Sequence, residues 1–345
     1  MRQLMMMLLC MVGISLAQAQ TQKIQVEAGN AESLLAAIHE ANQKHDGEQT
    51  DWLYIMIPDG TYDLGEKVLT TLTANHVALI GESMEGTVIK NQPPVENEGI
   101  STTATLRIIG SDNYLQDLTL LNALDYSKTT AAGRGVCLQD KGTRTICKRV
   151  RLLSNQDTYY SDNETGQMYF EDSEIHGTVD FICGAGDVTF NRCTLVTERR
   201  NSKGRCVIAA PRTSKTQWGY VFLDCTIRNN ESPFLYARGW RVTPKCTWIR
   251  TKLLTPEKLG PTRFDTKGMR TIDSYFKEFG TMDANDLLIN PDSNVLTLTL
   301  KDEKNTVETV LSKKDAKRYT VKNIYDKWKP EKIARKLERC AGDNR

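Results

Sequence analysis

Six short segments with one shared pattern recur along the middle of the chain. Each has apolar residues at its first and sixth positions, a polar residue at its third, and a small or apolar residue at its fourth. The six segments are 115–120, 147–152, 170–175, 190–195, 222–227 and 248–253. Their starting points lie 20 to 32 residues apart. An irregular repeat of this length is typical of a solenoid, in which each turn supplies one strand per face and the loops between turns vary.

A sandwich of antiparallel strands fits this chain less well. Its strands would be more evenly spaced, with hairpin signals at intervals of about 8–12 residues, and few such signals are present. A chain of 345 residues could hold two average domains, but solenoids of this length often form one unit. We therefore expect an all-β fold, a single-stranded right-handed parallel β-helix.

The open ends of a solenoid need cover, and helical patterns occur near both ends of the chain. Apolar residues at helical spacing predict a helix over 31–43, with Asn30 as its N-cap, that covers the N-terminal end of the stack. We expect short helices to cover the C-terminal end, the first of them capped by Ser312; they are predicted over 313–319, 321–328 and 330–337. The polar stretch 290–305 is predicted to be a surface excursion.

The first residues have the composition of an export signal. A basic residue near the start precedes an apolar run over 4–16 and an A-x-A triplet at 17–19. The run is too short to span a bilayer comfortably, and no later apolar stretch is long enough for a membrane span. We expect residues 1–19 to be a cleaved signal peptide and 20–345 to be one folded domain in a secreted or periplasmic protein.

Charge and cysteine content argue against some classes of function. The chain has 45 Lys and Arg against 43 Asp and Glu, without a long basic run, so its composition gives no case for binding nucleic acid. Eight cysteines follow the predicted signal peptide, and none is spaced as C-x-x-C, as zinc ligands often are. Disulfides are permitted in an exported chain, with Cys193 and Cys225 the best candidate pair, although thiols at strand positions also pack as small apolar side chains.

Two aspartates stand in apolar, β-like stretches beside side chains that can form hydrogen bonds. Asp157 lies in 156–160, with sequence QDTYY, and Asp180 lies in 177–184, with sequence GTVDFICG. Two carboxylates on adjacent strands can act as a nucleophile and a general acid/base. The alternative is that both are ordinary turn aspartates.

These two stretches resemble the active-site signatures of the pectin methylesterases. Four further segments match the family in the same order along the chain: 60–62 (GTY), 79–81 (LIG), 210–213 (APRT) and 236–240 (YARGW). The resemblance is clearest over residues 23–330. It implies a parallel β-helix that hydrolyses methyl esters of galacturonate in pectin or pectic oligosaccharides and releases methanol.

The resemblance also implies roles for particular residues. Asp180 is expected to attack the ester carbonyl, and Asp157 to act as the general acid/base. Gln156 is expected to donate to the oxyanion, and Arg238 to hold Asp180 with a charge-assisted hydrogen bond. Trp240 matches the tryptophan that stacks on a sugar ring.

Three residues near these motifs are also predicted to contact the substrate. They are Tyr160, Phe181 and His176. A single histidine near a turn more often has a structural role, so both interpretations of His176 stay open. The chain has no H-E-x-x-H motif, EF-hand loop or P-loop, and the mechanism expected here needs neither metal nor organic cofactor.

The chain departs from the family pattern at Arg134. The family usually has Gln-Ala-Val-Ala-Leu on the turn before the first aspartate, whereas this chain has RGVCL at 134–138. The guanidinium could stabilise an oxyanion, bind a carboxylate of the substrate, or pair with an active-site aspartate and keep it ionised. A second departure is Gly239, where the family has proline.

Two other function classes are considered besides the esterase. One is a non-catalytic or altered-specificity pectic-sugar-binding β-helix, in which Arg134 replaces the usual oxyanion-hole glutamine. The other, favoured less, is a β-helix polysaccharide lyase or glycosidase, which would need a calcium cluster or a different carboxylate set. For the leading hypothesis we expect a pectic substrate, no nucleic acid or membrane partner, and a monomer.

Overall fold

The computed structural model describes most of the chain after the predicted signal peptide, which lies outside the described residues. The described ranges are 22–45, 47, 50–129, 133–241, 243–269, 275–300 and 303–342. Within them, no helix has the length and apolar character needed to cross a membrane.

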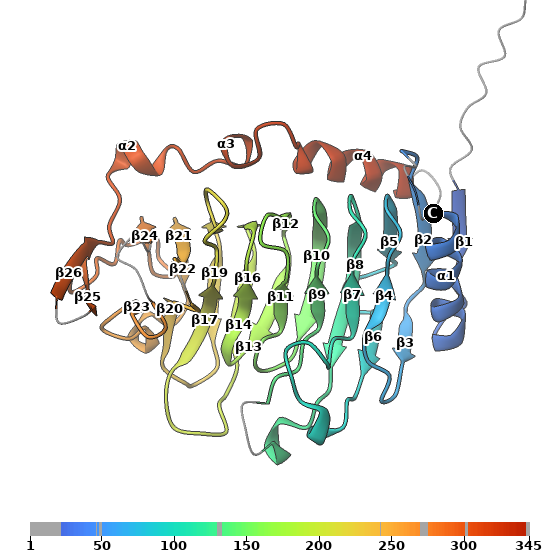
Figure 1. Cartoon of the computed structure of the whole chain (residues 1–345), viewed down its shortest axis with the longest axis horizontal. Helices are drawn as coiled ribbons and strands as arrows, with labels where there is room; N and C mark the ends of the chain where they lie inside the picture. Colours follow the sequence, from blue (N-terminus) through green and yellow to red (C-terminus); the bar gives the residue numbers. More distant parts are fainter. Residues whose placement is uncertain are drawn as a thin grey trace, which may run out of the picture.

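The chain winds into a parallel β-helix, which confirms the predicted fold (Figure 1). One large sheet has a main row and a second row of strands, and all of its pairs are parallel. The main row contains β1 (Gln22–Gln25), β2 (Leu53–Ile57), β5 (Val77–Gly81), β8 (Tyr114–Asn122), β10 (Thr145–Leu153), β12 (Gln167–Glu171), β15 (Asp187–Asn191), β18 (Tyr220–Leu223), β21 (Lys245–Ile249) and β24 (Tyr275–Phe279). The second row contains β3 (Gly60–Asp63), β6 (Thr87–Asn91), β13 (Glu174–Gly177), β16 (Thr194–Thr197), β19 (Thr226–Asn229) and β22 (Lys252–Leu253), and it is continued by the second halves of β8 and β10.

The other sheet has eight parallel strands. It contains β4 (Thr70–Leu72), β7 (Leu106–Ile108), β9 (Leu138–Asp140), β11 (Tyr159–Ser161), β14 (Val179–Gly184), β17 (Cys206–Pro211), β20 (Phe234–Arg238) and β23 (Phe264–Asp265). In the described ranges, three short 3₁₀ helices lie in the connections: η1 (Val95–Asn97), η2 (Tyr126–Lys128) and η3 (Pro256–Lys258).

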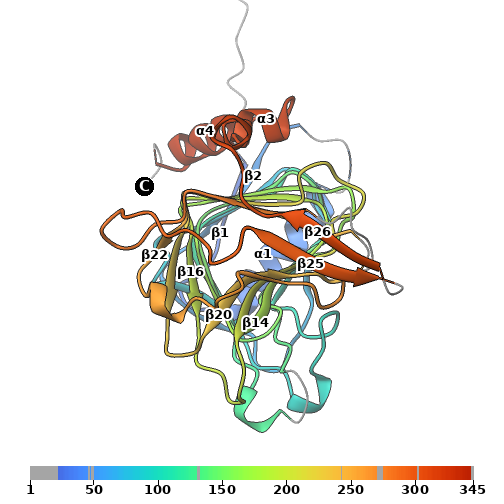
Figure 2. The ribbon, with the colours of Figure 1, turned by 90° about the vertical axis from the view of Figure 1, so that its left-hand side faces the viewer.

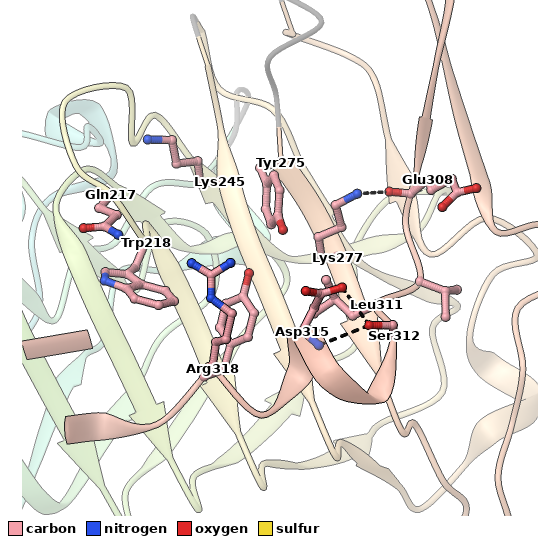
Figure 3. Close-up of a pocket in the computed structure, with 12 residues that line it drawn as sticks. Gln217, Trp218, Lys245, Tyr275, Lys277, Glu308, Leu311, Ser312, Asp315 and Arg318 are labelled. Atoms are coloured by element: carbon pink, nitrogen blue, oxygen red, sulfur yellow. Dashed lines mark hydrogen bonds between the residues drawn. The ribbon is translucent and has the colours of Figure 1, made fainter. Parts of the chain in front are cut away.

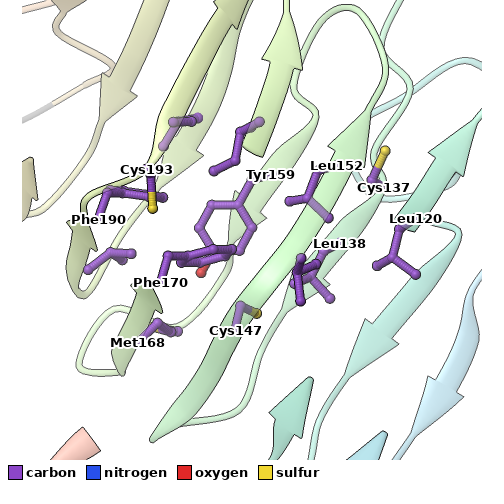
Figure 4. Close-up of a cluster of buried hydrophobic side chains, with 14 of the residues drawn as sticks. Leu120, Cys137, Leu138, Cys147, Leu152, Tyr159, Met168, Phe170, Phe190 and Cys193 are labelled. Atoms are coloured by element: carbon purple, nitrogen blue, oxygen red, sulfur yellow. The ribbon is translucent and has the colours of Figure 1, made fainter. Parts of the chain in front are cut away.

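The first residue of each repeat points into the core and stacks on its equivalent in the next turn. Phe170, Phe190, Phe222 and Trp248 form a column whose successive ring centroids are 5.0, 4.7 and 3.7 Å apart. Figure 4 shows part of this column with the aliphatic and thiol side chains around it. Parallel, in-register turns place equal residues over each other, so one apolar position per turn builds a continuous core.

The third residue of each repeat lies where the chain passes from the main row to the second row. All six have left-handed backbone with φ between 50° and 54°, and they alternate between acid and base along the stack. They are Asp117, Arg149, Asp172, Arg192, Asp224 and Arg250. Each arginine pairs with the aspartate of the preceding turn, at 2.5, 2.8 and 2.6 Å. We call this set the corner ladder.

Cys193 and Cys225 are buried free thiols in this structure. The disulfide considered from the sequence is therefore not formed. Both residues occupy the fourth position of a repeat, where a small apolar side chain fits beside the column of rings.

Helix α1 (Ala31–Lys44) covers the N-terminal end of the stack, as predicted (Figure 1). Its N-cap is Asn30, whose side-chain oxygen accepts a hydrogen bond from Ser33 N at 3.1 Å. Its buried face presents Leu34 and Ile38 to the core. A single amphipathic helix thus shields the first turn from water.

The C-terminal end is covered differently from the prediction. The antiparallel hairpin of β25 (Val295–Leu300) and β26 (Glu303–Glu308) lies across it, with Leu298 buried in the core and Leu296 packed against the core (Figure 2). The stretch expected to be a surface excursion therefore contributes a strand to this cover.

The C-terminal helices lie elsewhere, although each begins at the predicted residue; the first two are shorter than predicted and the third is longer. Helices α2 (Lys313–Ala316), α3 (Val321–Tyr325) and α4 (Pro330–Gly342) run back along the outer face of the large sheet toward the N-terminal end (Figure 1). The main-row strands are apolar on this outer face as well as in the core, and outward residues such as Tyr114 and Ile146 are buried beneath the helices. A sheet that is apolar on both faces needs a second cover, and the helices provide it.

Candidate active site

The two predicted aspartates lie on adjacent turns at the outer face of the eight-stranded sheet. Asp157 precedes β11, and Asp180 lies in β14, which pairs in parallel with β11. Both have left-handed backbone, with φ of 59° and 51°. The pairing of β14 with β17 shifts register between Val179 and Ile182. Such an irregularity re-aims side chains, here at Asp180.

Arg238 binds Asp180 through two hydrogen bonds. Its Nε donates to Oδ1 of Asp180 at 2.7 Å, and its Nη2 donates to Oδ2. Arg238 ends β20, two strands away from β14 in the sheet. Burial raises the pKa of Asp180, and the hydrogen bonds from Arg238 oppose this rise because they stabilise the carboxylate.

Asp157 is more deeply buried and lacks a comparable partner. Its side chain is 6% exposed, and its nearest cation is Arg134, with Nε 3.6 Å from Oδ2. Burial and then the charge of Asp180 raise the pKa of Asp157 to about 8, while Arg134 acts in the opposite direction. A carboxyl group with this pKa is mostly protonated at neutral pH.

Arg134 extends into the same cavity as the aspartates and lies between two acids. Its Nη1 is 3.5 Å from Oε1 of Glu98, and its backbone forms a parallel bridge with Gln156 on the next turn. Glu98 also accepts a hydrogen bond from the backbone N–H of Gly133. Glu98 was not predicted as a site residue, because no sequence motif links a loop residue to a partner 36 positions away.

The cavity has a volume of about 400 Å³. Its lining contains six of the predicted site residues and four others: Ile100, Arg134, Gln156, Asp157, Asp180, Cys183, Ala210, Arg238, Trp240 and Arg241. The structure therefore brings together Asp157, Asp180, Gln156, Arg238 and Arg134, and adds Trp240 at the edge of the same space.

Tyr160 supports the cavity from below, since it is only 5% exposed and its ring centroid lies 6.1 Å from that of Trp240. Its hydroxyl donates to Asp162 at 2.6 Å. The guanidinium of Arg212 lies 5.3 Å from the Trp240 ring and donates to Asp162 at 2.8 Å. Trp240 therefore packs against Tyr160 and Arg212, and both of these are held in place by Asp162.

The structure does not bring Phe181 or His176 to the cavity. Phe181 is fully buried in the core, because neighbours along a strand face opposite ways and Asp180 faces out. His176 bonds to Glu174 at 2.5 Å and to Glu198 at 2.6 Å, carboxylates that are not part of the cavity lining. The predicted contacts of these two residues with substrate are therefore not supported. Phe181 packs in the core, and His176 is held by two carboxylates.

Gly239, the second departure from the family pattern, packs tightly. A Cβ there would lie 2.6 Å from Cγ of Met269 and 3.2 Å from Cγ of Pro244. The absence of a side chain lets the loop that carries Trp240 pack closely against these two residues. Among the residues that the structure describes, no group of three or more His, Cys, Asp or Glu side chains is arranged to hold a metal ion.

Comparison with known proteins identifies the family of this chain. Residues 24–243 match the family described as Pectinesterase. The chain belongs to the pectinesterase family. Among curated pectinesterases, it is 27% identical over 190 residues to pectinesterase 3 of Solanum lycopersicum, covering 55% of this chain and 33% of that protein. The chain spans between 33% and 49% of the length of three plant pectinesterases that it matches.

Solved pectin methylesterases share the fold. A pectin methylesterase from Erwinia chrysanthemi superposes with a TM-score of 0.68 at 23% identity, covering 91% of this chain and 99% of that one. A pectin methylesterase in complex with a hexasaccharide gives the same TM-score and identity, covering 90% and 99%. At this identity the likeness supports the β-helix, and the function of this pectinesterase-family chain must be argued from its own residues.

Proposed function

We propose that this chain is a pectin methylesterase that hydrolyses methyl esters of galacturonate in pectin or pectic oligosaccharides and releases methanol. The observation that carries the proposal is the unequal pair of carboxyl groups in one cavity. Asp180 is bound bidentately by an arginine, while Asp157 has a pKa raised to about 8. One group is thus prepared to attack as a carboxylate and the other to donate a proton.

In the first step, an oxygen of Asp180 attacks the ester carbonyl carbon at C6 of the sugar. The tetrahedral intermediate collapses, the bond from the carbonyl carbon to the methoxy oxygen breaks, and methanol leaves with the proton of Asp157. The products of this step are an acyl-enzyme anhydride on Asp180 and an ionised Asp157.

In the second step, a water molecule attacks the acyl carbon while Asp157 takes one of its protons. The bond to Asp180 breaks, Asp180 leaves as a carboxylate, and Asp157 is again protonated. The galacturonic acid product is released and loses the remaining proton of the water to solvent. The two aspartates therefore return to their starting states without a metal or an organic cofactor in the scheme.

Three other cavity residues complete the proposal. Gln156 and Arg134 stand on adjacent turns, where either can donate to the oxyanion. Trp240 offers an aromatic face for a sugar ring. That a pectin methylesterase of this fold has been solved with a hexasaccharide supports a saccharide ligand for this cavity.

Export stays a prediction, because the predicted signal peptide lies outside the described residues. The monomeric state also stays a prediction. We propose that the mature chain acts on its substrate in a secreted or periplasmic setting. A cell-fractionation experiment with N-terminal sequencing of the mature protein tests this, with a start near Gln20 as the expected result.

The decisive test is methanol release from a panel of methylated galacturonan and branched pectic fragments. We expect methanol without any gain in the absorbance of unsaturated sugars, whereas a lyase would give the opposite pattern. One observation favours a second candidate, a non-catalytic sugar-binding β-helix: the positive charge of Arg134 acts against protonation of Asp157. Binding of these fragments without methanol release would support that second function.

A further inference from the structure

A second hollow, of about 480 Å³, lies on another face of the molecule (Figure 3). It opens beside α2, over the C-terminal strands of the main row, and shares no lining residue with the cavity that contains the aspartates. The mechanism proposed above does not use it.

Aromatic side chains form the walls of this hollow. Trp218 and Tyr319 meet edge to face, with ring centroids 5.4 Å apart. Tyr275 projects from β24 and is hydrogen-bonded to Tyr319, and the ammonium group of Lys277 lies 4.9 Å from the Tyr275 ring centroid. Aromatic faces held in fixed positions are suited to the C–H faces of a sugar ring.

The position of Trp218 is set by a buried carboxylate. Asp187 is only 7% exposed, and its Oδ1 accepts hydrogen bonds from Trp218 N at 2.9 Å and from Gly219 N at 2.6 Å. The loop that carries Trp218 is therefore fixed to the sheet before any ligand binds. Preorganised walls reduce the ordering cost of binding.

Cations outnumber acids around the hollow. Lys245, Lys277 and Arg318 line it, and within the described parts of the chain none of the three has a carboxylate within ion-pair distance. The two lysines donate to the backbone carbonyls of Thr216 and Glu308 rather than to a carboxylate, although Asp187 and Glu308 act electrostatically on Lys245 and Lys277.

Two acids also line the hollow, but one of them is already engaged. Asp315 accepts a hydrogen bond from the hydroxyl of Ser312 at 2.6 Å and takes part in the N-cap of α2. Glu308 is exposed at the rim. Figure 3 shows Arg318 and Trp218 side by side, facing the same space. An aromatic wall next to an unpaired guanidinium matches a ring that carries a carboxylate.

We propose that this hollow is a second sugar-binding site that holds a uronate residue of an acidic polysaccharide outside the catalytic cavity. The identity of the ligand rests on the proposed function, since de-esterified galacturonan is the product of that reaction. Trp218 and Tyr319 contact the ring face, and Arg318 pairs with the carboxylate. A chain bound here is retained by the protein while another segment occupies the cavity.

The test is native affinity electrophoresis of the full chain in gels that contain de-esterified polygalacturonate. The Trp240→Ala variant weakens binding in the catalytic cavity, and we expect it to remain retarded by the polymer. Adding Arg318→Glu is expected to weaken the apparent affinity about tenfold, as for the loss of one charge-assisted contact. Lys317→Glu is the matched control, because it makes the same charge change at an exposed neighbour that does not line the hollow.

Three results would overturn the second site. They are loss of retardation in Trp240→Ala alone, equal effects of Arg318→Glu and Lys317→Glu, and equal Arg318-dependent retardation by dextran sulfate, which would indicate a general polyanion surface. Methanol release from short methylated oligomers is measured in parallel and is expected to be unchanged by Arg318→Glu. Arg318-dependent retardation in a chain that releases no methanol would keep this site and reject the proposed function.

Discussion

Aspartates with left-handed backbone occur in two places on the β-helix, and their surroundings differ sharply. In the corner ladder, Asp117, Asp172 and Asp224 each pair with an arginine of the next turn at 2.5 to 2.8 Å. In the cavity, Asp180 has a close arginine partner, whereas the ion-pair partner of Asp157 is a guanidinium at 3.6 Å that is shared with a second acid. The residue type and backbone conformation are the same in both places.

Burial and incomplete pairing separate the two sets. The side chains of Asp172 and Asp224 are 39% and 43% exposed, whereas that of Asp157 is 6% exposed. Asp117, at 12%, is nearly as buried as the cavity aspartates but has a close arginine partner, so burial acts only together with incomplete pairing. Each carboxylate of the corner ladder has an arginine on the next turn that pairs with it and helps to hold the turns in register. A buried carboxylate beside another acid, with too little positive charge nearby, retains its proton. One backbone position therefore gives a structural ladder at one corner and acid/base chemistry at another.

The largest effect is expected from removing the nucleophile. Asp180→Asn should lower kcat for methanol release by about 10⁴-fold or more, because an amide can neither attack nor leave as a carboxylate does. Circular dichroism and thermal unfolding should stay close to those of the unmodified chain. Near-normal methanol release would remove Asp180 from the mechanism.

The matched control for that variant is Asp172→Asn. It makes the same substitution at nearly the same φ, 51° in both cases, but in the corner ladder. Its methanol release should equal that of the unmodified chain. If both variants lost activity to the same degree, the contrast between the two sets of aspartates would be wrong.

The next effect concerns pH. Asp157 must be protonated to release methanol, and its pKa is raised to about 8. As pH rises through this value the protonated fraction falls, so kcat/KM should decline about tenfold per pH unit above it. The profile is measured with a neutral methyl ester substrate. A rate that stays constant from about pH 7 to about pH 10 would show that Asp157 is not the acid.

Arg134 allows the incomplete pairing of Asp157 to be tested directly. Its charge lowers the pKa of Asp157, so Arg134→Gln should move the alkaline limb of the profile to higher pH and favour plain methylated galacturonan. Arg134→Ala removes a donor as well and should lower kcat by about 10²-fold. Arg192→Gln in the corner ladder is the control. If neither Arg134 variant differs from the unmodified chain on any substrate, Arg134 is only a surface residue.

Much of the fold could be predicted because each turn of a solenoid repeats the same pattern of buried and exposed positions. The recurring apolar positions of the six segments were enough to predict a parallel solenoid, but not the column of stacked rings that includes Trp248. The cover of the C-terminal end was not predicted, because helical periodicity shows that a helix has an apolar face but not which surface it contacts. The near-continuous apolar runs of main-row strands such as 53–57 and 77–81 were the available signal, since they indicate burial on both faces.

The candidate site was predictable only where a short motif carried it. Asp157 and Asp180 stood in recognisable stretches, whereas Glu98 directly follows η1 in a connection between strands and meets Arg134 only after folding. Phe181 was assigned to the substrate because it adjoins Asp180, yet strand alternation turns it into the core. Proximity in sequence is a poor guide on a strand, where neighbours face opposite ways.

The smallest effect is expected in the corner ladder itself. Asp224 and Arg250 form a pair with side chains 43% and 46% exposed. Exposed pairs of this kind contribute about 0.2–1 kcal/mol, less at high salt. We therefore expect Asp224→Asn to lower the free energy of unfolding by no more than about 1 kcal/mol and to leave methanol release unchanged.

Asparagine is the right replacement here, because it tolerates left-handed backbone and so removes the charge without adding strain at φ 52°. A double-mutant cycle with Arg250→Gln, measured by chemical denaturation at low and high salt, isolates the pair from other effects. A coupling energy of several kcal/mol that salt does not reduce would mean that the ladder behaves as a buried network. A difference in exposure could then not explain why the ladder aspartates and the cavity aspartates behave differently. The unequal pairing of Asp157 and Asp180 would have to explain it alone.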